Sequence, residues 1–177
     1  FIYIGTLVYG AGIFLIGQMY NFGGDFPTAF LLWSLGVLPL AFQLKDKYLM
    51  LFVNILFGVY LYVSFDMSFP YMGWVGIPVA YLGFNYFDKS RLLLFFANLT
   101  TLSFISLITL RYEVKGLYVL LLFFGIGLAM YGVKHTLKRN IFQLQGNILL
   151  GVTGVILTIP ELWIVVASAP STRLISL

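Results

Sequence analysis

Charged residues divide the chain into seven long stretches that carry no charge. These stretches are residues 1–20, 26–44, 48–65, 67–87, 92–110, 116–133 and 141–160, each 18 to 21 residues long. A helix that crosses a hydrocarbon core of about 30 Å needs about 20 residues. The stretches lack the polar–apolar alternation of membrane-barrel strands. The pattern predicts an all-α transmembrane bundle of seven helices over residues 1–160, with 161–177 as a tail or the start of a further helix.

The composition agrees with this pattern and excludes several chemistries. The chain is 61% hydrophobic and 9% charged, whereas soluble domains are about 45–50% apolar and about 25% charged. Without cysteine it has no disulfide, no thiolate nucleophile and no Cys-ligated metal. Its single histidine, His135, lies in a basic loop, so haem ligation by two histidines is excluded. We therefore expect an integral membrane protein with no cofactor and no metal.

The basic residues are distributed unevenly between the loops. Seven of the ten lie in loops 45–47, 88–91 and 134–140, and the other three are Arg111, Lys115 and Arg173. By the positive-inside rule these three loops are cytoplasmic, and the protein is a multi-pass protein of a bacterial inner membrane. We expect membrane lipids as partners, with anionic headgroups at the basic loops. No basic groove with interleaved aromatic residues indicates nucleic acid.

One asparagine follows each basic loop at the same distance. Asn54, Asn98 and Asn147 stand nine residues after Lys45, Lys89 and Lys138. This recurrence predicts a chain built from helical hairpin repeats. Nine helical residues rise about 13.5 Å, close to half the thickness of the hydrocarbon core. Because an unpaired amide in hydrocarbon is costly, we expect all three side chains to point inward near the midplane, at least two of them in one polar cluster.

Other polar and small residues extend this pattern. In stretch 141–160 one helical face carries Gln143, Asn147, Gly151, Gly154 and Thr158, and in stretch 92–110 Asn98 is followed by Thr101 and Thr109. These groups are either interhelical hydrogen-bonding partners or the lining of a central polar cavity. Small residues predict close helix packing at Gly5, Gly10, Gly12 and Gly17 and along Gly125, Ala129 and Gly132.

Several residues carry signals for helix ends and bends. Asp25 and Ser68 are expected to cap helices whose first turns contain Pro27 and Pro70. Pro39 and Pro78 lie inside apolar stretches and are expected to bend their helices.

No catalytic constellation is visible in the sequence. There is no Gly-x-Ser-x-Gly elbow and no His-Glu-x-x-His motif. The six acidic residues all lie in loops or at helix ends, whereas proton-coupled pumps carry an ionisable group at depth. We therefore expect a protein that is not an enzyme.

The most distinctive local sequence lies at the first predicted outer turn. Residues 16–25 read IGQMYNFGGD, and residues 31–41 read LLWSLGVLPLA. These two motifs resemble an uncharacterised bacterial family of polytopic membrane proteins, known only as a domain of unknown function. The resemblance covers about residues 5–45 and implies further helical segments before Phe1, but it implies no activity.

Three function classes remain open on this basis. The preferred one is a binding or transport module for a small molecule or ion, with ligand-binding residues Asn54, Asn98, Asn147, Gln143 and Thr101 in a central polar cavity and Gln18, Tyr20 and Asp25 at the outer turn. The second is a structural or accessory subunit that packs against another membrane protein or a second copy. A more distant third is a lipid-acting enzyme that uses the face from Gln18 to Asp25.

The predicted orientation can be tested directly because the chain has no cysteine. Single cysteines introduced as Ser90→Cys and His135→Cys are expected to be protected from a membrane-impermeant thiol reagent in intact cells. Cysteines introduced as Asn21→Cys and Ser68→Cys are expected to react. Labelling of the first pair with protection of the second would reverse the orientation.

Overall fold

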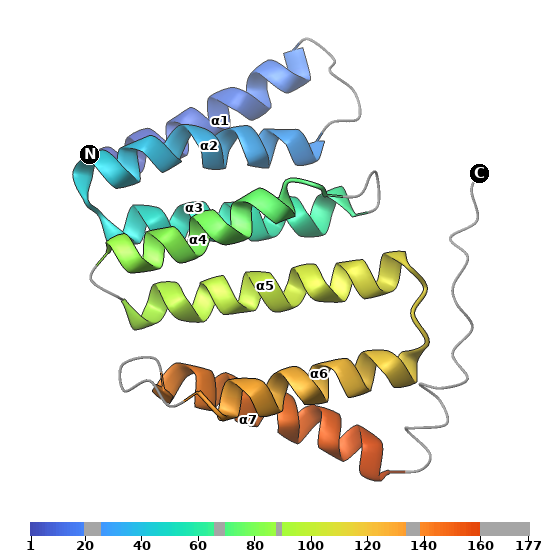
Figure 1. Cartoon of the computed structure of the whole chain (residues 1–177). Coiled ribbons are helices and arrows are strands. Elements are labelled where there is room, and N and C mark those ends of the chain that lie inside the picture. Colours follow the sequence, from blue (N-terminus) through green and yellow to red (C-terminus); the bar gives the residue numbers. More distant parts are fainter. Residues whose placement is uncertain (20–25, 66–69, 88–89, 134–138, 160–177) are drawn as a thin grey trace, which may run out of the picture. The chain divides into compact units, whose positions relative to one another are not determined.

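The fold is entirely helical wherever it is described. The computed structural model describes residues 1–19, 26–65, 70–87, 90–133 and 139–159, and these ranges contain no strand (Figure 1). Seven helices follow in order: α1 (Ile2–Met19), α2 (Phe26–Leu44), α3 (Lys47–Ser64), α4 (Gly73–Tyr86), α5 (Arg91–Arg111), α6 (Gly116–Tyr131) and α7 (Arg139–Thr158). The all-α fold is confirmed, and the charged residues do mark most of the helix ends.

The helices differ in their ability to cross a membrane. Five of them, α1, α2, α3, α5 and the Ile141–Thr158 part of α7, are long and apolar enough to span by length and composition. Helix α6 has 16 residues and α4 has 14. Fourteen residues rise about 21 Å, which is less than the hydrocarbon core of about 30 Å. The expectation of seven full spans is therefore supported for five of them.

Helix α4 is shorter than predicted because it starts late. Pro70 was expected in the first helical turn, but it lies before the helix, and the expected cap Ser68 is outside the described residues. The amides of Gly73, Trp74 and Val75 each bond to the carbonyl three residues earlier, at 2.9, 3.2 and 3.1 Å. Only from Gly76, whose amide lies 2.9 Å from the Met72 carbonyl, does the helical pattern begin.

The chain forms two compact units, which we describe separately. The first is Phe1–Leu107 and the second is Ile108–Leu177. In the first unit α1 packs on α2, α2 on α3 and α3 on α4, and hydrogen-bonded side chains connect α5 to α3 and α4. Consecutive helices in this unit run in opposite directions (Figure 1). The second unit is built on the α6–α7 hairpin.

Glycines receive bulky side chains at the helix contacts of the first unit. Trp33 of α2 lies against Gly10 of α1, and Tyr9 of α1 lies against Gly36 of α2. The Trp33 indole also donates a 2.8 Å hydrogen bond to the Thr6 carbonyl. The expected packing role of Gly10 is present, whereas Gly5, Gly12 and Gly17 have no neighbour within 4 Å of a built Cβ.

Helix α4 uses glycine in the same way on two sides. Gly76 and Gly83 accept Phe57 and Met50 of α3, and Gly73 accepts Phe104 of α5, in positions that a Cβ atom would occupy. These three close approaches fix α4 between α3 and α5. Because glycine has no side chain, a side chain of α3 or α5 makes the contact at each of these positions of α4, the shortest helix of the unit.

In the second unit two glycines bring α6 and α7 together. A Cβ on Gly146 would lie 2.9 Å from the Gly127 carbonyl oxygen and 3.0 Å from the Tyr131 nitrogen, and one on Gly127 would lie 3.0 Å from Leu150 Cγ. The expected packing face of α6 was different: Gly125 has no neighbour within 4 Å and Ala129 is exposed. Gly132 meets only the backbone of its own helix.

Two glycines of α7 provide a matched test of this contact. Gly146→Ala is expected to lower the free energy of unfolding by about 1–3 kcal/mol, because the methyl group meets the backbone of α6. Gly151→Ala meets nothing within 4 Å, so it is expected to leave stability unchanged or raise it by up to about 1 kcal/mol through helix propensity. Unfolding followed by circular dichroism in detergent measures both. Equal losses in the two variants would contradict the proposed contact.

Candidate functional site

Two of the three predicted asparagines are buried and the third is not. Asn54 on α3 and Asn98 on α5 are 4% and 2% exposed. Asn147 on α7 is exposed, so the expectation that all three point inward is wrong for Asn147.

Asn54 links α3 to α5. The Thr100 hydroxyl lies 3.0 Å from Asn54 Oδ1 and 2.9 Å from the Phe96 carbonyl oxygen. A threonine hydroxyl has a single proton, so these two acceptors share it. One end of the Asn54 amide is thus held by Thr100.

Asn98 links α5 to α4 through a different set of partners. The Tyr81 hydroxyl donates a 2.7 Å hydrogen bond to Asn98 Oδ1, and the Thr101 hydroxyl lies 3.5 Å from the same Tyr81 oxygen. Thr101 also donates to the Ala97 carbonyl at 2.8 Å. The bonded partners of Asn54 and Asn98 therefore join two different pairs of helices, as interhelical hydrogen bonds do.

The face of α7 that is buried differs from the polar face that was predicted to be buried. Of its expected polar face, Asn147, Gly151 and Thr158 are exposed, and Gln143 and Gly154 are half-buried. The buried positions among the described side chains of α7 are Ile141, Gln145, Gly146 and Thr153. The physical reason is the close approach of Gly146 to α6, which sets the rotation of α7. Residue 147 is about 100° further around the helix and points away from that contact.

The predicted outer-turn site is described only in part. Gln18 lies near the end of α1 and is exposed. The structure does not describe Tyr20, Gly23, Gly24 or Asp25, so the predicted capping by Asp25 lies outside the described residues. The predicted basic loop at 134–138 lies outside them as well. Between α2, α3 and α4, by contrast, the first unit contains a cavity that the sequence did not predict.

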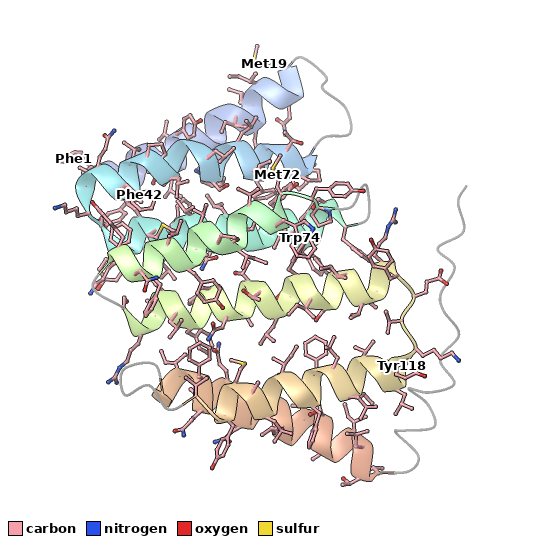
Figure 2. The ribbon with its side chains drawn as sticks, in the orientation of Figure 1. Phe1, Met19, Phe42, Met72, Trp74 and Tyr118 are labelled. Carbon is pink, nitrogen blue, oxygen red and sulfur yellow. The ribbon has the colours of Figure 1, made fainter. Side chains whose placement is uncertain are left out.

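This α2–α4 cavity has a volume of about 90 Å³ and is lined by Leu31, Ser34, Leu35, Leu38, Met50, Val53, Asn54, Phe57, Met72, Val75, Gly76, Val79 and Ala80. Leu35, Met72 and Val75 are 52%, 50% and 61% exposed, so the cavity reaches the outer surface of the unit at these side chains. Met72 lies at the start of α4 (Figure 2).

The lining includes two polar side chains. The Ser34 hydroxyl donates to the Leu31 carbonyl at 2.8 Å and is thereby satisfied. Asn54 bonds to Thr100 at one end of its amide and makes no other hydrogen bond with the described residues. No buried side-chain nitrogen or oxygen atom of the described residues lacks a hydrogen-bond partner, so the Asn54 nitrogen is an accessible atom where Asn54 lines the cavity.

The sequence signal for this cavity was incomplete. Asn54 was recognised, but Ser34, Met72 and Gly76 were not. Small or polar residues within the apolar stretches could have indicated Ser34 and Gly76. The role of Met72 depends on the late start of α4.

A double-mutant cycle tests the bond between α3 and α5. Asn54→Leu and Thr100→Val are expected to show a coupling energy of about 0.6 kcal/mol, and no more than about 1.7 kcal/mol. The matched control pairs Asn54→Leu with Thr101→Val, whose hydroxyl bonds to other partners, and is expected to show a coupling energy near zero. Equal coupling in both cycles, measured by unfolding in detergent, would contradict the assigned pairing.

Comparison with known proteins finds a family that is similar to the start of the chain. No curated protein and no solved structure matches the chain. Residues 1–50, which include α1, α2 and the start of α3, match the model of a family described as a predicted membrane protein, DUF2157. This stretch contains the residues 5–45 that resemble an uncharacterised family. Over its first 50 residues the chain is thus similar to a family of predicted membrane proteins, and the apolar helices agree with a multi-pass membrane protein.

Proposed function

We propose that this protein is a membrane-embedded binding protein for an apolar or amphiphilic small molecule, and that the α2–α4 cavity is its binding site. The observation that carries this proposal is an apolar cavity that opens at the exposed side chains of Leu35, Met72 and Val75 and has the Asn54 amide in its lining. The proposal includes no catalysis. It places the chain in a bacterial inner membrane with loops 45–47, 88–91 and 134–140 in the cytoplasm.

The lining favours an apolar molecule over an ion. Ten of the thirteen lining residues are leucine, methionine, valine, phenylalanine or alanine, and none is charged. A hard cation takes several oxygen ligands, whereas this cavity offers the Ser34 hydroxyl and the Asn54 amide. Binding sites for small molecules are mostly apolar with a few polar groups that fix the orientation of the ligand, and they have volumes of about 300–1,000 Å³. A cavity of about 90 Å³ therefore admits only one end of such a molecule, and the rest lies along the open side at Leu35, Met72 and Val75.

Asn54 supplies the polar contact in this proposal. Its oxygen accepts from Thr100, so the end that remains is the nitrogen, which donates to a carbonyl, ether or carboxylate oxygen. A ligand with one such group near an otherwise apolar body fits both the amide and the lining.

We propose binding rather than transport as the primary property. The transport hypothesis rested on a central polar cavity formed by Asn54, Asn98 and Asn147. Asn54 and Asn98 bond to different partners, and Asn147 is exposed on α7. One alternative is an accessory subunit without a site of its own, and a binding experiment distinguishes it from the proposal.

The proposal can be tested with the fluorescent fatty acid cis-parinaric acid and the purified chain in detergent. Val79→Phe adds a ring to the cavity lining and is expected to weaken binding at least tenfold, because the added volume occupies the site. The matched control is Val8→Phe on α1, whose side chain is 65% exposed and does not line the cavity. It is expected to bind as the unchanged chain does. Fluorescence titration measures both.

A third variant separates the polar contact from the apolar lining. Asn54→Leu is expected to weaken binding of parinaric acid more than binding of an apolar probe of the same length, octadecatetraene, which has no carboxyl group. Equal binding by the unchanged chain, Val79→Phe and Val8→Phe would show that the probe partitions into detergent and would favour the accessory-subunit alternative.

A further inference from the structure

A second pocket of different chemistry lies at the end of the first unit where α2 meets α3. It has a volume of about 560 Å³ and is lined by Tyr3, Leu44, Lys45, Asp46, Lys47, Tyr48, Phe87 and Ser90. Its residues come from the start of α1, the α2–α3 loop and the α4–α5 connection, so two of the predicted basic loops meet at one site. We call it the lysine pocket.

Both lysines of this pocket have an ammonium group available for a ligand. Lys45 and Lys47 are exposed, and neither forms an ion pair with a described residue. The Lys47 ammonium lies 5.2 Å from the centre of the Tyr48 ring, where a cation–π contact holds it at the pocket.

The backbone holds Lys45 in a fixed position at the end of α2. Its amide bonds to the Phe42 carbonyl at 3.3 Å, and the next amide, that of Asp46, bonds to the Ala41 carbonyl at 3.2 Å. This pair of bonds is the Schellman motif, which places Lys45 in the left-handed region with a φ of 51°. Glycine is the usual residue at this position, so a lysine stands where glycine would be less strained.

Asp46 forms hydrogen bonds with Tyr3 and Tyr48 inside the pocket and forms no ion pair with either lysine. It accepts a hydrogen bond from the Tyr3 hydroxyl and a 2.8 Å hydrogen bond from the Tyr48 backbone amide, which caps α3. Burial raises the pKa of the Asp46 carboxyl, but these hydrogen bonds and Lys47 lower it more, so the net shift is downward and the group is ionised near neutral pH. With one carboxylate and two ammonium groups, the described lining of the pocket has a net positive charge.

We propose that the lysine pocket binds the phosphate group of an anionic membrane lipid. Lys45 and Lys47 supply the positive charge, and the half-buried Ser90 hydroxyl supplies a hydrogen-bond donor from the opposite loop. The pocket lies at helix ends, which is the level of lipid phosphates in a bilayer that α2 and α3 cross. This site is separate from the α2–α4 cavity and does not depend on it.

A phosphate anion could also come from a soluble molecule, and the lining favours the lipid. Leu44 and Phe87 line the pocket beside its charged residues. A headgroup joined to acyl chains meets both kinds of surface, whereas inorganic phosphate meets only the charged one.

Native mass spectrometry of the purified chain in a neutral detergent tests the proposal. Dioleoyl phosphatidylglycerol is expected to bind more tightly than dioleoyl phosphatidylcholine, which has the same acyl chains. Lys47→Gln and Lys45→Gly are each expected to weaken phosphatidylglycerol binding about fivefold, and the double variant about 25-fold. Lys45→Gly is expected to keep the thermal stability or raise it, because glycine suits the left-handed backbone, so lost binding cannot be ascribed to misfolding.

Two controls come from the end of α5 and the loop that follows it. Glu113 has a φ of 48° in the same kind of helix end, where the amides of Glu113 and Val114 bond to the Leu110 and Thr109 carbonyls at 3.2 and 3.0 Å. Glu113→Gly therefore repeats the backbone change of Lys45→Gly and is expected to leave lipid binding unchanged. The pair Arg111→Gln and Lys115→Gln repeats the charge change of the lysine double variant and is expected to leave it unchanged as well.

Three outcomes would overturn the proposal. The first is an equal loss of binding in the Arg111 and Lys115 control, which would mean that net charge alone attracts the lipid. The second is equal affinity for the two lipids. The third is displacement of phosphatidylglycerol by millimolar inorganic phosphate, which would assign the pocket to a soluble phosphate instead.

Discussion

The fold depends on glycine backbones that admit the side chains and backbone of the neighbouring helix. Lipid tails are as apolar as leucine, so helices inside a membrane gain little by hiding apolar surface from one another, and close van der Waals packing has to hold them together. Gly10 and Gly36 accept aromatic rings between α1 and α2, and Gly76 and Gly83 accept side chains of α3 on α4. Gly146 brings the backbones of α6 and α7 within reach of each other. These contacts decide which face of each helix turns inward, and the polar residues then find partners where that rotation leaves them.

The asparagines illustrate this order of causes. Asn54 and Asn98 lie on faces that packing turns inward, and each finds a hydroxyl on a neighbouring helix. Asn147 is one residue after Gly146, so the contact that brings α7 against α6 turns its amide outward. An equal distance from a basic loop fixes the depth of a residue along its helix. It does not fix the direction of the side chain, which is why a repeat in the sequence did not become a three-fold cluster in space.

The sequence predicted helices better than sites because it indicates the depth of a residue along its helix but not the direction of its side chain. Charged residues cannot lie in the hydrocarbon core without large cost, so they mark helix ends, and the predicted ends of α2, α3 and α5 are within one residue of those observed. The start of α4 was missed because the amides of Gly73, Trp74 and Val75 bond to the carbonyl three residues earlier, a local effect that charge does not report. The α2–α4 cavity combines residues of three helices, and the lysine pocket combines two loops with the start of α1. Such sites depend on helix rotation, which neither composition nor spacing determines.

The short α4 has a consequence for the surrounding bilayer. Its 14 residues rise about 21 Å, several ångströms less than the acyl region around its neighbours. Irregular backbone at membrane depth is tolerated only where protein covers it, and Pro70, which is fully buried and has no amide proton to satisfy, suits such a position. For α4 to cross the bilayer, the acyl chains beside it have to shorten to meet the rest of the mismatch. We therefore expect the membrane to be thinner beside α4, where Met72 and Val75 open the cavity. Membrane thickness would then influence which molecules reach the cavity.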